Sequence, residues 1–88
     1  MRVRVKEVGT GVRPYEVLLQ IDTVEGPQDL VLDERSLIGG TIEVGYPIAQ
    51  HADLRLIELP SETARGTWRV WVKESSLMPD GAHQEAAE

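Results

Sequence analysis

The chain has 88 residues, a formal net charge of −6 and no cysteine. This length corresponds to one domain with a small core, and the missing cysteines exclude disulfide frameworks, cysteine-based zinc sites and thiolate catalysis. The acidic charge argues against a protein that binds bulk nucleic acid or anionic membranes, because both require a basic surface.

The apolar residues are mostly valine, leucine and isoleucine, with no phenylalanine at all. Such a composition favours pleated, β-branched packing. No stretch approaches the roughly 18 apolar residues of a membrane span, and the first residues alternate charge with valine, unlike a signal peptide. We therefore expect a cytoplasmic protein that makes no use of a membrane.

Alternating charged and apolar residues predict a first strand over residues 2–8 and a second over residues 15–22. Residues 25–28 predict a turn, and residues 29–33 predict a strand that returns beside the second as a hairpin. Leu18 lies on the mixed face of the second strand, so we expect that face to be partly covered.

Asp33 is placed to cap a single helical turn over residues 34–38, which Gly39 would end in a left-handed conformation. Residues 41–46 predict a fourth strand, because apolar residues alternate there. A loop is expected over residues 48–53.

A fifth strand is predicted over residues 54–59, where the apolar spacing slips and indicates either a bulge or burial on both faces. A tight turn at residues 61–66 precedes the last strand, residues 67–73. We expect the domain to span residues 1–78 and residues 79–88, which hold no large apolar anchor, to form a disordered acidic tail.

These elements predict an all-β fold, either a small six-stranded SH3-like barrel or a strongly bent antiparallel sheet with at most one short helical turn. The tight turn before the last strand favours the SH3-like arrangement. An OB-type barrel is less favoured, because it usually inserts a helix between its third and fourth strands.

The last strand carries the one constellation that is typical of a contact surface. Its alternation directs Trp68 inward with Val70 and Val72, and directs Trp71 outward between two cations. If the first and last strands are neighbours, the basic row of the first strand extends this surface. The predicted binding residues are then Arg2, Arg4, Lys6, Arg69, Trp71 and Lys73. The alternative is that these cations only solvate the sheet and pair with carboxylates across strands.

The sequence contains no recognisable catalytic or metal-binding motif. His51 and His83 lie in a loop and in the tail, so no short spacing places two imidazoles on one metal, and no serine stands in a nucleophile motif. We therefore expect no catalytic residue, no bound metal, no cofactor and no enzymatic activity.

Two functions of different classes follow. The first is a non-enzymatic protein-interaction module that binds a protein partner or a second copy of itself through the face around Trp71. The alternative is a single-stranded nucleic-acid-binding barrel, in which the basic row contacts phosphates and Trp71 stacks on a base.

Overall fold

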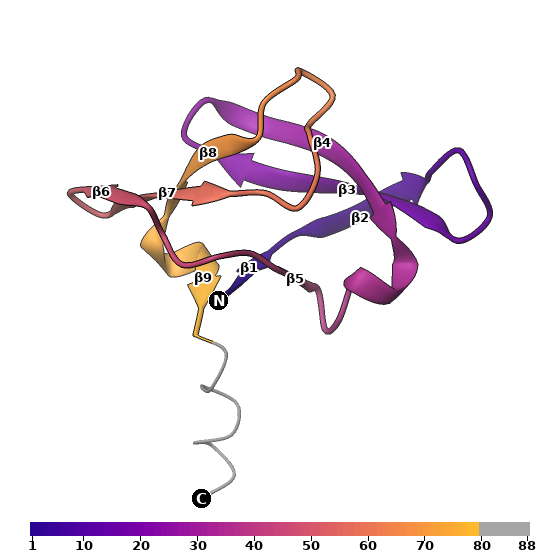
Figure 1. The fold of residues 1–88 in the computed structure, drawn as a ribbon, viewed down its shortest axis with the longest axis horizontal. Helices are drawn as coiled ribbons and strands as arrows, with labels where there is room; N and C mark the ends of the chain where they lie inside the picture. Colours follow the sequence, from indigo (N-terminus) through magenta and orange to yellow (C-terminus); the bar gives the residue numbers. More distant parts are fainter. Residues whose placement is uncertain (80–88) are drawn as a thin grey trace, which may run out of the picture.

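The structure is a computed structural model, and it describes residues 1–79. Within these residues nine strands form three antiparallel sheets, with the orders β5-β1-β9, β2-β3-β4 and β6-β7-β8 (Figure 1). The strands are β1 Arg2–Arg4, β2 Lys6–Thr10, β3 Glu16–Thr23, β4 Gly26–Asp33, β5 Thr41–Glu43, β6 Ala49–His51, β7 Leu54–Glu58, β8 Arg69–Lys73 and β9 Leu77–Met78. The all-β prediction is confirmed. Neither the predicted six-stranded barrel nor a single bent sheet is found, because the described strands form three separate ladders that do not close. Two short 3₁₀ turns, η1 (Glu34–Ser36) and η2 (Glu74–Ser76), are present where at most one helical turn was predicted.

The predicted first strand is divided between two sheets. Its first part, β1, pairs with β5 and β9, whereas its second part, β2, pairs with β3. The division falls at Val5, whose N–H donates to the carbonyl of Gly40 at 3.0 Å. One extended stretch thus serves two sheets, and Figure 1 shows it as the indigo ribbon that runs from β1 into β2.

The predicted hairpin of the second and third strands is confirmed as β3 and β4, which pair over eight residues each. Its turn is tighter than expected, because Thr23 already pairs with Gly26. Pro27 therefore lies inside β4, at the edge of the β2-β3-β4 sheet, where a residue without an N–H is tolerated. The predicted cap is also present: Asp33 accepts a hydrogen bond from the Arg35 N–H at 2.8 Å, at the start of the 3₁₀ turn η1 (Glu34–Ser36).

The core fills the space enclosed by the three sheets. It draws on the inward residues of six strands and on two residues that directly follow strands. Its members are Val3, Val17, Leu19, Ile21, Leu30, Ile42, Val44, Ile57, Leu59, Val70 and Val72. Burial of these side chains is the main stabilising term available to a domain without disulfides.

The segment between β5 and β7 differs most from the prediction. The fourth strand was expected to continue to residue 46, but β5 ends at Glu43 and Tyr46 is 75% exposed. The loop predicted over residues 48–53 contains the short strand β6. Its turn places Ala52 at a positive φ of 55°, a conformation that the alternation of apolar residues does not reveal.

The irregular spacing of apolar residues in β7 reflects burial on both faces of this strand. The β7–β8 register runs without a shift, so β7 has no bulge against this neighbour. Ile57 lies in the core, and Leu54 and Leu56 face the other way, partly exposed. The disordered tail predicted over residues 79–88 falls outside the described residues, apart from Pro79.

Candidate interaction surfaces

The side of the β6-β7-β8 sheet that faces away from the core carries large apolar side chains. Leu56 pairs directly with Trp71, and Leu54 pairs with Lys73, so these side chains share one face of the sheet. Leu54, Leu56 and Trp71 are each partly exposed, whereas Val70 and Val72 are buried on the other face. We call this surface the outer face. The prediction that Trp71 points away from Val70 and Val72 is therefore confirmed.

Charged side chains border the outer face at both ends. At one end the exposed Arg69 contacts Glu58 across the ladder, with Nε and Oε2 3.4 Å apart. At the other end lies the exposed Lys73, which pairs with Leu54 across the ladder, and Leu54 in turn pairs with His51 of β6. An apolar centre with a charged rim is the usual anatomy of a protein contact surface.

The six predicted binding residues do not gather on one sheet. Arg2 and Arg4 belong to β1 and Lys6 to β2, whereas the residues around Trp71 belong to β8. The neighbours of β1 are β5 and β9, and β8 pairs only with β7. The assumption that the first strand and the strand of Trp71 pair side by side is therefore wrong. The strand that pairs with β1 on the side away from β5 is β9, which has two residues and is the last strand of the described chain.

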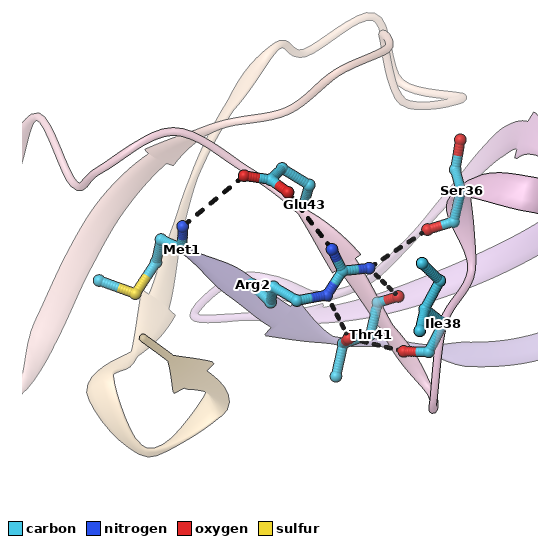
Figure 2. Close-up of polar contacts among 6 residues, drawn as sticks. All are labelled: Met1, Arg2, Ser36, Ile38, Thr41 and Glu43. Carbon is cyan, nitrogen blue, oxygen red and sulfur yellow. Dashed lines mark hydrogen bonds and ion pairs between the residues drawn. The ribbon is translucent and has the colours of Figure 1, made fainter. Parts of the chain in front are cut away.

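Arg2 is engaged in contacts within the protein, as Figure 2 shows. Its Nε donates to Thr41 Oγ1 at 2.7 Å, and its Nη2 donates to the Thr41 carbonyl at 3.0 Å and to the Ser36 carbonyl at 3.4 Å. Its Nη1 lies 3.4 Å from Glu43 Oε1, and the amino group of Met1 lies 3.9 Å from the other oxygen of that carboxylate. Arg2 thus joins β1 to β5 and to the 3₁₀ turn. It has few donors left for an external ligand.

Trp68 was predicted to be a core residue, and this prediction is wrong. The Leu59 N–H donates to the Trp68 carbonyl at 2.7 Å, so the register of β7 and β8 extends to this pair and Trp68 keeps its inward direction. Leu59 is buried, but Trp68 is 51% exposed. The reason is that this end of the sheet faces an open groove, which the alternation of one strand cannot reveal. The position of Trp68 directly after a turn was the available signal.

The groove beside Trp68 has a volume of about 470 Å³. One wall is formed by β5 and the residues after it, and the other by the end of β7 and the residues after it. Its lining consists of Glu43, Val44, Gly45, Glu58, Leu59, Pro60 and Trp68.

A chain of partly buried hydrogen bonds fixes the segment that leads to Trp68. The Thr67 hydroxyl donates to Gln28 Oε1 at 2.9 Å, because a carbonyl oxygen only accepts. The Thr63 hydroxyl, 2.6 Å from Thr67 Oγ1, must then be the donor of that pair. Gln28 and Thr63 are both buried, and the Ala64 N–H adds a bond to the Asp29 carbonyl at 2.7 Å. The exposed indole is thus carried by a segment that is anchored to β4.

A local electrostatic feature lies at the 3₁₀ turn, away from the outer face. Arg35 hydrogen-bonds the Asp33 carboxylate through its side chain and its backbone N–H, and this lowers the pKa of Asp33 below its ordinary value. The same pairing raises the pKa of Arg35. Both effects stabilise the charged forms at the cap of the turn.

Comparison with known proteins gives no relative: no known family, no curated protein and no solved structure matches the chain. Within residues 1–79, no group of three or more acidic or histidine side chains is arranged to hold a metal ion. Over the same residues, no helix has the length and apolar character needed to cross a membrane.

Proposed function

We propose that the protein is a non-enzymatic protein-interaction module that binds a protein partner, or a second copy of itself, through the outer face around Trp71. The observation that carries the proposal is the partial exposure of Leu54, Leu56 and Trp71 on one sheet face. A domain of this size gains stability when such a face is covered, and aromatic side chains at the centre of a patch contribute most to binding.

The rim supports the same proposal. Arg69 and Glu58 form an exposed pair, and Lys73 has no ion pair among residues 1–79. Rim charges of this kind set the orientation and rate of association more than its affinity. The partner is therefore expected to present an apolar centre with charges that complement this rim.

Sedimentation equilibrium over a range of concentrations tests the self-associating form. We expect the wild type to dimerise and Leu56→Lys to remain monomeric, because the substitution places a charge at the centre of the outer face. The matched control is Val12→Lys, since Val12 is 94% exposed in the segment that joins β2 and β3. A wild type that is monomeric at every concentration would contradict the self-associating form.

Single-stranded nucleic-acid binding is the second candidate, because Arg69 and Lys73 flank Trp71 on the outer face. It has less support, since Arg2 is engaged within the protein and β1 does not pair with β8. Titration with an oligothymidylate should quench the emission of a Trp68→Phe variant, in which Trp71 is the remaining tryptophan. Emission that stays constant at low salt would remove this candidate.

A further inference from the structure

The open side of β5 presents backbone groups that no other strand uses. β5 has one neighbour, β1, and the Val44 N–H donates to the Met1 carbonyl at 2.8 Å on that side. Successive residues of an antiparallel strand direct their backbone groups to opposite sides. The N–H and C=O groups of Glu43 therefore point away from β1, and neither these groups nor those of Gly45, two residues further on, have a backbone partner within residues 1–79.

The end of β7 presents a second free edge. The Leu59 N–H bonds toward β8, so the backbone groups of Glu58 point to the opposite side, where β6 would lie if it were longer. β6 begins at Ala49, opposite Leu56, and therefore leaves Glu58 without a strand partner.

These two edges line the same groove. Glu43 and Gly45 belong to one wall and Glu58 to the other, with the exposed indole of Trp68 beside Pro60. The space beside Gly45 is open, because a Cβ added there would meet no atom within 4 Å. The groove continues along β5 into a second depression that shares Glu43 and Pro60. The second depression adds Arg2, Leu32, Arg35, Ser36, Ile38 and Ile42 to the lining.

We propose that this groove binds an extended segment of a partner protein, which adds to the free edge of β5 as a further strand. In strand addition the backbone supplies affinity and alternate side chains supply specificity. Here an apolar side chain of the segment would pack on Trp68 and Pro60. The site is distinct from the outer face, so the inference goes beyond the proposed function.

The charges at the part of the groove beside Trp68 define the partner segment. Glu43 and Glu58 border opposite walls, with side chains 67% and 54% exposed, and their arginine contacts are both 3.4 Å long. A lysine or arginine in the bound segment would compensate these carboxylates. The net charge of −6 disfavours a second copy of this chain as the occupant, and its own basic segment, β1, is already paired on both sides.

Selection from a displayed library of random nine-residue peptides against the whole protein tests the proposal. The selected peptides should alternate apolar with polar residues and contain at least one lysine or arginine. With such a peptide bound, hydrogen exchange at the amides of Glu43 and Gly45 should slow at least tenfold, because these N–H groups gain partners.

A matched pair of variants isolates the backbone contribution. Gly45→Pro removes the N–H donor, whereas Gly45→Ala keeps it and places a methyl group in open space. The proline variant should bind the selected peptides about tenfold more weakly than the alanine variant, as expected for the loss of one strand hydrogen bond. If the proline variant does not fold, Trp68→Ala replaces it and should also weaken binding about tenfold.

Three results would overturn the proposal. The first is a library that yields no binder, and the second is a set of peptides that bind both Gly45 variants equally. The third is a wild-type dimer that dissociates only in the proline variant, because the occupant of the groove would then be a second copy of this chain. Leu56→Lys should leave peptide binding unchanged, so that failure of this inference is distinguished from failure of the outer-face proposal.

Discussion

The two hairpins β3–β4 and β7–β8 are built from similar residues and occupy different environments. In β3 the alternate residues Val17, Leu19 and Ile21 are buried, and their partner strand covers the full length of eight residues. In β7–β8 the core-facing residues are buried as well. Both hairpins also carry an apolar pair that is partly exposed on the opposite face, Leu18 with Val31 in the first and Leu56 with Trp71 in the second. The hairpins differ at their edges: β3 and β4 pair along their whole length, whereas β6 covers the edge of β7 only as far as Leu56 and leaves Glu58 without a strand partner.

The largest expected effect is on the free energy of unfolding, when the same leucine-to-alanine substitution is made in each hairpin. Leu19→Ala removes a side chain with no exposed surface and should lower the free energy of unfolding by about 3 kcal/mol. Leu56→Ala removes a partly exposed side chain and should cost about 1 kcal/mol. Urea denaturation monitored by tryptophan emission measures both values. Equal losses would contradict the difference in burial between these two positions.

The second prediction concerns the hydrogen bonds that anchor the segment between β7 and β8 to β4. Thr67→Val removes the hydroxyl that donates to Gln28 and accepts from Thr63, so the Gln28 side-chain carbonyl loses this donor and the Thr63 hydroxyl loses this acceptor. We expect a loss of about 2 kcal/mol and a red shift of Trp68 emission, because the anchored segment loosens. Thr10→Val, at an exposed strand position, serves as the control and should change stability by less than about 0.5 kcal/mol.

The third prediction contrasts two glycines, one beside each hairpin. A Cβ at Gly11 would lie 2.5 Å from Glu16 Cβ and 2.8 Å from Val31 Cγ1, so Gly11→Ala should cost about 1–2 kcal/mol. The same change at Gly45 meets open space and should leave thermal unfolding almost unchanged. A stabilising Gly11→Ala would show that the β2–β3 connection adjusts more easily than the close contact implies.

The smallest expected effect is a pH dependence at the end of the β3–β4 hairpin. Because Arg35 lowers the pKa of Asp33 in the folded state, this pair stabilises the fold above the ordinary aspartate pKa, and the contribution is lost as pH falls through the lowered value. An NMR titration of the Asp33 carboxyl should show a depressed midpoint, which Arg35→Gln returns toward normal. An unchanged midpoint in the variant would assign the shift to another cause.

Local patterns predicted the parts of this fold that depend on neighbouring residues. The β3–β4 hairpin, the cap at Asp33 and the two faces of β8 follow from alternation and turn chemistry, which act over a few residues. The same alternation indicated that Trp71 would face away from the core.

The tertiary arrangement decided which strands pair and which surfaces stay open. The division of the first strand at Val5, the short β6, the exposure of Trp68 and the free edge of β5 depend on contacts between residues far apart in the chain. Alternation gives the direction of a side chain but not the element that lies opposite it. The sequence by itself therefore determined the β3–β4 hairpin and the two faces of β8, whereas the division of the strands among three sheets, and the groove that this packing leaves beside Trp68, were decided by the tertiary structure.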